Sequence, residues 1–298
     1  MNSENSKKGD LFFQYYCVIF IDLLGQRERL RKITQIPISE TEKQPFIDTI
    51  KQSVGKVLQI RGLFQTYFDT GISYEPNVER IPPEFHDEFR ASQREKLHYN
   101  TFSDSLTISV PLMPNSDESC AAVNGIFCAL IAAAGIGISA LLMDTPLRAG
   151  LNVGVATLID NNEIYGPALE GAVYLESRLA EYPRFLVGDQ FWRYLVAIEQ
   201  QVPLRRMGQY AKEMAALCQK MIVLDTDGRL MVDFLGETIR HLPENPITKE
   251  DIVQARDFVI SQYNQYAEAE NHKLASRYFR LMRYFKSREA AWGIASAW

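Results

Sequence analysis

The chain of 298 residues is long enough for one large domain with an appendage, or for two small domains. Its hydrophobic content of 46% is that of a globular protein with a real core. The formal net charge of −5 argues against a general nucleic-acid binder, which usually carries a basic face. An acidic protein still binds an anionic nucleotide where metal ions supply positive charge locally.

Cysteine usage and the N-terminus indicate a reducing compartment. Cys17, Cys120, Cys128 and Cys218 have no CxxC spacing, so we expect reduced thiols and no zinc site. Residues 1–10 are polar and lack the apolar centre of a signal peptide, so we expect a flexible tail. The sequence therefore predicts a cytoplasmic protein.

The first part of the chain alternates between strand and helix patterns. Residues 15–22 are β-branched and aromatic, which predicts a buried strand ending at Asp22. Residues 45–69 place apolar side chains at helical spacing. Residues 70–97 are polar and rich in Pro, Glu and Arg, and are expected to form an irregular insertion. Residues 98–112 contain two β-prone runs around a polar turn, which predicts a hairpin.

The next part of the chain begins with its longest apolar stretch, residues 120–143. Length alone would permit a transmembrane span, but the Ala and Gly content and the flanking strand patterns favour a buried helix. Residues 146–157 predict a strand, 168–181 a helix and 184–188 a short strand. Residues 221–234 predict two strands around an Asp-Gly turn.

The C-terminal segment, 247–298, is helical by period, with Thr248 as the N-cap and Asp251 at the third helical position. We take it as a helical module that follows a main domain over 11–238. Strands alternate with helices, but two hairpins are embedded among them. This order excludes a simple doubly wound parallel sheet and predicts an α+β fold with a mixed sheet.

Two aspartates are the candidate metal ligands. Asp22 ends the first strand, and Asp104 lies in the turn of the first hairpin. Hard divalent cations prefer carboxylate oxygens, and two carboxylates on neighbouring strand ends can hold a metal pair. The alternative is that each Asp is an ordinary turn or strand-end residue.

Four segments together resemble the catalytic domain of class III adenylate and guanylate cyclases, in the order of that family and over roughly residues 15–190. They read VIFIDLLGQ, FSDSLTISV, LRAGLNVGVA and IYGPALEGAVYLES. The resemblance implies a ferredoxin-like βαββαβ core with a C-terminal helical extension. It also implies head-to-tail homodimers whose sites take metal ligands from one chain and base contacts from the other.

The resemblance implies that Asp22, Asp104 and the backbone carbonyl of Leu23 hold two divalent metal ions, Mn²⁺ or Mg²⁺. The backbone amides expected near the triphosphate are those of Leu24, Gly25 and Gln26. A glycine lets the backbone approach closely, and amides that start a helix bind phosphate. Gly25 could equally serve an ordinary strand-to-helix turn.

Some positions depart from the family pattern. Asn100 stands where adenylate cyclases place a purine-reading Lys, and Glu170 and Tyr174 stand where the family has its transition-state Asn and Arg. Either the domain is inactive or it reads another base; keeping both aspartates favours activity. The size, the insertion and the altered positions resemble the Pycsar bacterial anti-phage cyclases. The nominated base pocket consists of Phe20, Asn100, Phe102, Glu163 and Ile164, although both Phe residues could belong to the core.

The resulting expectation is a cyclase that converts UTP into 3′,5′-cyclic UMP and pyrophosphate. The product would be a second messenger in anti-phage defence, read by a downstream cyclic-nucleotide receptor effector. A cytidylate, adenylate or guanylate cyclase and a non-catalytic nucleotide-binding dimerisation module are the alternatives. Neither a nucleic-acid partner nor a membrane span is expected.

Overall fold

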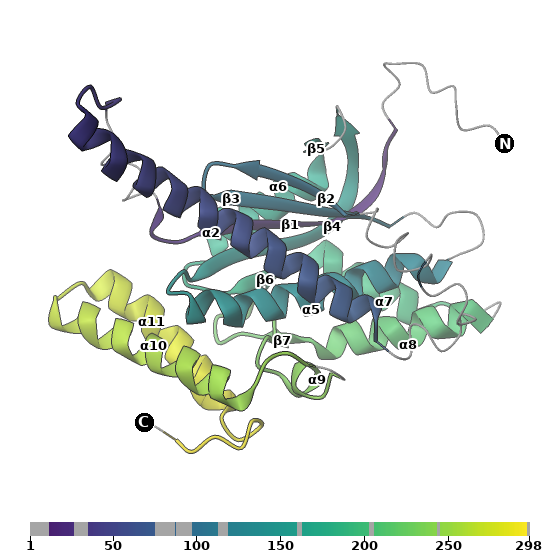
Figure 1. Ribbon diagram of the computed structural model, residues 1–298. Helices are drawn as coiled ribbons and strands as arrows, with labels where there is room; N and C mark the ends of the chain where they lie inside the picture. Colours follow the sequence, from purple (N-terminus) through teal and green to yellow (C-terminus); the bar gives the residue numbers. More distant parts are fainter. Residues whose placement is uncertain are drawn as a thin grey trace.

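The computed structural model describes residues 12–26, 35–74, 87, 97–112, 119–159, 163–202, 206–242 and 245–296. They form an α+β fold with a mixed eight-stranded sheet, in the order β2-β3-β1-β4-β6-β8-β7 with β5 paired to β4 (Figure 1). The predicted fold class is therefore confirmed. The strands are β1 (Gln14–Leu23), β2 (His98–Phe102), β3 (Ser105–Pro111), β4 (Leu147–Ile159), β5 (Glu163–Tyr165), β6 (Phe185–Val187), β7 (Ile222–Leu224) and β8 (Leu230–Val232).

The central unit of the fold is β1-α2-β2-β3-α5-β4, a ferredoxin-like βαββαβ arrangement. β1 lies between β3 and β4 and pairs antiparallel with both. Its side chains alternate between the two faces, with Ile19 and Ile21 in the main core and Phe20 and Asp22 on the opposite face. β6 extends the sheet by parallel pairing with β4, and the β7–β8 hairpin closes that edge.

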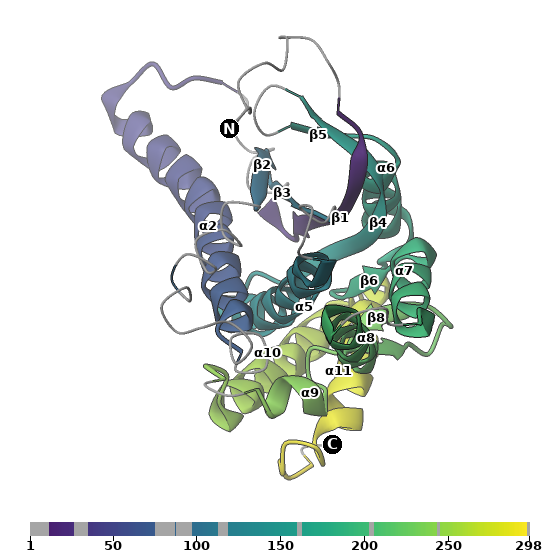
Figure 2. The ribbon, with the colours of Figure 1, turned by 90° about the vertical axis from the view of Figure 1, so that its right-hand side faces the viewer.

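Two long helices, α2 (Glu40–Ile72) and α5 (Ser119–Leu142), pack against each other on one side of the sheet (Figure 2). The apolar segment Val123–Leu142 of α5 has a mean hydropathy of 2.3 and could span a membrane by length and composition. Within this fold 89% of its most apolar window is buried. The predicted buried helix is thus confirmed. Most of the insertion over 70–97 lies outside the described residues.

The opposite face of the sheet is covered over β1 and β4 by α6 (Pro167–Tyr174), which continues as a π-helical turn, Leu175–Leu179. The expected helix over 168–181 is therefore shorter and ends irregularly. Gly150 on β4 explains how closely this helix approaches the strand. A Cβ there would lie 2.1 Å from the carbonyl oxygen of Ala172, so any larger residue would push α6 away.

After the π-helical turn, the regular elements of the described chain are helices, apart from β6 and the β7–β8 hairpin. These helices are α7 (Asp189–Gln200), α8 (Arg206–Lys220), α9 (Glu237–Arg240), α10 (Lys249–Glu268) and α11 (His272–Arg288). Thr248 and Asp251 form the predicted capping box, which satisfies amide groups at the start of α10. Asn271 caps α11 and divides the terminal segment into two helices. Their apolar side chains join the main core, so this segment is packed onto the rest.

Three of the cysteines, Cys17, Cys128 and Cys218, are free and buried. Burial raises the pKa of the Cys17 thiol to about 12. A buried thiol of raised pKa is inert at neutral pH, in line with reduced cysteines. The side chain of Cys120 lies outside the described residues.

Candidate functional site

Backbone pairing brings the two predicted metal ligands together. The amide of Leu23 at the end of β1 donates to the carbonyl oxygen of Asp104 at 3.1 Å. Asp22 is the cross-strand neighbour of Ser105, the residue after Asp104. Each aspartate is only 4% exposed, and both line a cavity of about 690 Å³. The structure therefore places two buried carboxylates at adjoining strand ends on one hollow.

The segment after β1 lines the same cavity. The amide of Leu24 donates to the carbonyl oxygen of Pro146 at 3.0 Å, which ties the segment to the start of β4. Gly25 has φ +85°, a left-handed conformation that favours glycine. Gln26 is buried, and its Oε1 has no hydrogen-bond partner among the described residues. The three residues predicted to lie near the triphosphate thus border the aspartate cavity.

Arg148 neutralises part of the negative charge of this site. Its Nη2 donates to Oδ2 of Asp22 at 2.9 Å and lies 2.7 Å from Oε1 of Glu176 in the π-helical turn. All three side chains are largely buried, so the guanidinium compensates two carboxylates away from solvent. This pairing gives Arg148 a structural role, and Arg148 also lies on the wall of the cavity.

The cavity also contains side chains that the sequence reasoning missed. Lys56 of α2, Asp144 before β4 and Arg277 of α11 add charges. Tyr266 and Tyr278 line it from α10 and α11, and their rings stack at 5.6 Å between centroids. Their helical periodicity was visible in the sequence, but no local signal indicated that these helices fold back over the aspartates.

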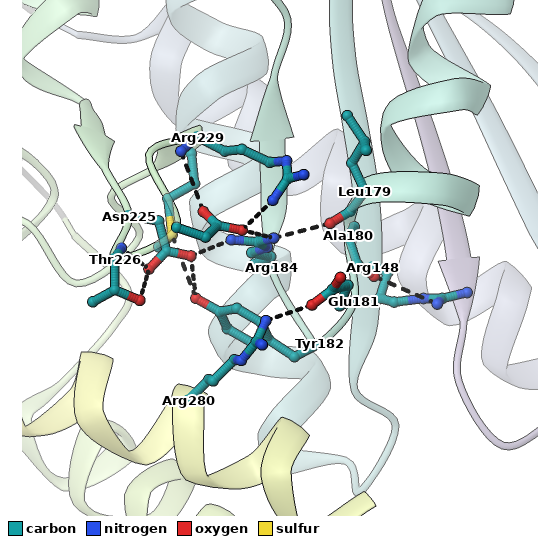
Figure 3. A network of polar contacts seen from close by, with 12 residues as sticks. Arg148, Leu179, Ala180, Glu181, Tyr182, Arg184, Asp225, Thr226, Arg229 and Arg280 are labelled. Carbon is teal, nitrogen blue, oxygen red and sulfur yellow. Dashed lines mark hydrogen bonds and ion pairs between the residues drawn. The ribbon is translucent and has the colours of Figure 1, made fainter. Parts of the chain in front are cut away.

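A buried ionic network fixes the segment that follows the π-helical turn (Figure 3). Arg184 is 0% exposed and its guanidinium contacts Asp225, Oδ2 of Asp227 at 2.7 Å and the carbonyl oxygen of Leu179 at 2.9 Å. The Tyr182 hydroxyl donates to Oδ2 of Asp225 at 2.6 Å, and the Tyr182 ring lies 4.6 Å from the guanidinium carbon. The β7–β8 turn is thereby locked to the sheet.

This locked segment also contacts the site and α11. Arg148 donates through Nη1 to the carbonyl oxygen of Ala180 at 3.4 Å, and Arg280 of α11 forms an ion pair with Glu181 (Figure 3). These contacts therefore connect the main chain beside Arg148 to one face of α11.

The nominated base-pocket residues fall into two groups. In the strand register, Phe20 and Asn100 are the two neighbours of Thr107, one on each side. Phe102 is opposite Ser105, which is also the neighbour of Asp22. The side chains of Phe20, Asn100 and Phe102 therefore lie on the same face of the sheet as Asp22. Phe20 is partly exposed and packs at the edge of a small cluster under α6. Phe102 is 82% exposed, so it is not a core residue in the single chain.

Glu163 and Ile164 lie far from the aspartates. Ile164 on β5 pairs with Leu158 of β4, ten residues along the strand from Arg148, which is opposite Asp22. At about 3.3 Å per residue this separation is about 30 Å. Glu163 is exposed and Ile164 buried. One chain thus keeps these residues and the aspartates apart, and only a second copy could bring them together.

The possible metal ligands of this site meet some of the requirements of a hard divalent cation. Among the described residues no group of three or more His, Cys, Asp or Glu side chains is placed to hold a metal ion. The two aspartates supply carboxylate oxygens, and a carboxylate has lone pairs enough to serve both a cation and Arg148.

No protein-family model matches the chain, and no curated protein matches it significantly.

Proposed function

We propose that the protein is a homodimeric nucleotide cyclase that acts on UTP and releases cyclic UMP and pyrophosphate. The observation that carries this proposal is the pair of buried carboxylates, Asp22 and Asp104, on one cavity beside a glycine-containing turn. The ferredoxin-like order of the sheet supports it, because it is the core that the sequence resemblance implied.

In the reaction the ribose 3′ hydroxyl oxygen attacks the α-phosphorus, the bond from that phosphorus to the pyrophosphate group breaks, and the hydroxyl proton passes to solvent. Asp22, Asp104 and the carbonyl of Leu23 would hold divalent cations, which when bound supply Lewis-acid stabilisation of charge on the phosphate oxygens. The amides of Gly25 and Gln26 would orient the phosphates, whereas the amide of Leu24 is bonded to the carbonyl oxygen of Pro146. Arg148 keeps Asp22 in position, since its ion pair fixes one carboxylate oxygen.

A second copy of the chain would complete the site. Glu163 lies about 30 Å of strand away from the Asp22–Arg148 pair, so it contributes only across a dimer interface. Large apolar side chains are exposed near the strands that such an interface would use: Tyr15, Phe102, Val155, Tyr165 and Tyr174. Exposed apolar clusters of this kind are typical of protein interfaces.

The base assignment depends on Asn100 and Glu163. Asn100 offers one donor group and one acceptor to a base edge, and Glu163 could accept the N3 proton of uracil, which cytosine lacks. Phe20 and Phe102 would wall in a small base. A site that hydrogen-bonds one edge discriminates strongly against a base without the matching group. We therefore place UTP ahead of CTP and both ahead of purine nucleotides.

The experiment is turnover of UTP with Mn²⁺ by the full chain, followed as pyrophosphate release and as cyclic UMP by chromatography. The matched variants are Asp104→Asn, which removes a proposed ligand, and Asp48→Asn, which removes an exposed charge on α2. We expect wild type and Asp48→Asn to form cyclic UMP and Asp104→Asn to form none. Equal product from all three would refute the assignment.

A second candidate is a non-catalytic nucleotide-binding module, and one observation favours it. Arg148 already pairs with Asp22, as in a purely structural ion pair. This candidate predicts that UTP binds with a measurable affinity and is recovered unchanged after prolonged incubation with Mn²⁺. Formation of any cyclic nucleotide would eliminate it.

A further inference from the structure

A second hollow of about 390 Å³ lies beside the aspartate cavity, between the π-helical turn and α11. The two hollows are neighbours, because Arg148 and Arg277 line both of them. We define the second hollow as the cationic groove. Its charged lining is Arg148, Arg178, Lys273, Arg277, Arg280 and one carboxylate, Glu181.

The positive charge of the cationic groove is only partly compensated. Arg148 pairs with Asp22 and Glu176, and Arg280 pairs with Glu181. The ion pairs among the described residues of the groove involve Arg148 and Arg280, and none involves Arg277, Lys273 or Arg178. An acidic protein therefore concentrates unneutralised cations on one hollow, which raises the local concentration of anions.

Arg277 is the cation at which this uncompensated positive charge is clearest. Partial burial lowers the pKa of its guanidinium, and the nearby charge of Arg148 lowers it further. Glu181 offsets part of this effect, but two like charges held close together still create a place where a bound anion would be favourable. The Nε of Arg148 is also buried without a hydrogen-bond partner among the described residues.

The groove is built on rigid elements. Lys273, Arg277 and Arg280 are spaced i, i+4 and i+7 along α11, which puts them on one helix face. The opposite wall is the main chain around Ala180, held by the Arg184 network (Figure 3). Guanidinium groups bind phosphate oxygens in bidentate geometry, and most side chains that line the groove are charged or polar.

We propose that the cationic groove is a phosphate-chain subsite, in which Arg277 and Lys273 of α11 bind the polyphosphate of the nucleotide or the pyrophosphate after its release. That the ligand is the polyphosphate of a nucleotide, or pyrophosphate, rests on the proposed function. That the ligand is an anion with phosphate groups rests on the groove alone. This subsite gives the C-terminal helices a role in binding, because Arg277 of α11 lines both the cationic groove and the cavity that holds the aspartates.

The test is calorimetric titration of the full chain, without metal ions, with inorganic pyrophosphate, with UTP and with uridine. Pyrophosphate and UTP should bind, and uridine should bind at least tenfold more weakly. Binding of uridine as tightly as UTP would overturn the phosphate assignment, as would failure of wild type to bind pyrophosphate or UTP. The affinities for pyrophosphate and for UTP are then compared, which shows whether the groove binds the product or the substrate more tightly.

The variants are Arg277→Gln and Lys273→Gln, with Arg283→Gln as the control, since Arg283 is exposed on α11 and does not line the groove. We expect Arg277→Gln to weaken pyrophosphate binding at least tenfold, Arg277→Lys to recover part of it and Arg283→Gln to leave it unchanged. Lys273 is exposed, so its variant keeps the test valid if Arg277→Gln unfolds. Equal binding by Lys273→Gln, Arg277→Gln and Arg283→Gln would overturn the proposal.

The outcomes separate this inference from the proposed function. Pyrophosphate binding that depends on Arg277 but comes without cyclic product would keep the groove and refute the cyclase. Cyclic product from a wild type whose pyrophosphate affinity is insensitive to Arg277 and Lys273 would keep the cyclase and refute the groove.

Discussion

Arg148 of β4 and Asp22 of β1 are cross-strand neighbours, and Nη2 of Arg148 donates to Oδ2 of Asp22 at 2.9 Å. The same guanidinium reaches Glu176, so a single cation joins the strand end of β1 to the π-helical turn. This relation orients a proposed metal ligand and compensates two buried carboxylates at once. Its loss should therefore affect both stability and the site.

Arg148→Met should destabilise the protein by about 3 kcal/mol, because removing one partner of a buried ion pair leaves uncompensated charge. The measurement is the free energy of unfolding in urea. The double variant Arg148→Met/Glu176→Gln should lose less than the sum of the single variants, since one orphaned carboxylate is then neutral. Strict additivity, or an unchanged midpoint for Arg148→Met, would contradict the role given to this pair.

Asp22→Asn and Asp104→Asn should each weaken Mn²⁺ binding at least about tenfold, because each variant replaces a carboxylate ligand with a neutral amide. Electron paramagnetic resonance of free Mn²⁺ measures this directly. Asp48→Asn, on the exposed face of α2, is the matched control and should bind as wild type does. Equal Mn²⁺ affinity for all four proteins would remove both aspartates from the metal site.

Acid should weaken the β7–β8 turn through Asp227. Burial acts to raise the pKa of this carboxyl, but hydrogen bonds from Arg184 and Arg229 outweigh it and hold the pKa well below the ordinary value of 3.8. A carboxyl with a depressed folded pKa contributes stability at higher pH and loses it as the pH falls. The contribution should be complete above about pH 5 and decline below about pH 4.

The check is the unfolding free energy of wild type and Asp227→Asn at neutral pH and near pH 3. We expect the variant to be less stable at neutral pH and the difference to shrink near pH 3, where the carboxyl of the unfolded wild type takes up a proton and that of the folded protein stays ionised. A difference that stays constant or grows as the pH falls would show that the Arg184 pairing is not the source of the stability.

A mixture of two inactive variants should recover activity if the site is shared between two copies. Asp104→Asn removes a ligand, and Glu163→Gln alters the base-contacting residue that lies about 30 Å along the strand. Random pairing of equal amounts makes half of the dimers mixed, each with one intact site, so about a quarter of wild-type activity should return. No recovery from folded, exchanging dimers would contradict a site shared between two copies, because one chain keeps Glu163 and Asp104 apart.

The elements with local signals were predictable from the sequence. The apolar run of β1, the polar turn that contains Asp104 and the Thr248 cap each lie within a few residues of the pattern that indicates them. The apolar helix α5 was also correctly expected to be buried, because its small residues and flanking strands are typical of a core helix.

Features that depend on contacts distant in sequence were not predicted. Arg184 meets Asp225 and Asp227 across about forty residues, and neither side has a local pattern that reveals the pairing. The helices α7 and α8 received no assignment from the sequence. The cationic groove was also missed, because Lys273 and Arg277 look like ordinary surface cations until α11 folds beside Arg148.

The most direct test of the central claim is to incubate the full chain with Mn²⁺ and each of the four ribonucleoside triphosphates separately, and to identify the products by mass spectrometry. The account predicts 3′,5′-cyclic UMP from UTP, at a rate that exceeds conversion of the other three nucleotides, and no cyclic product from Asp104→Asn. Preferential conversion of ATP or GTP would refute the base assignment. Recovery of all four triphosphates unchanged from the folded wild-type dimer would contradict the cyclase itself.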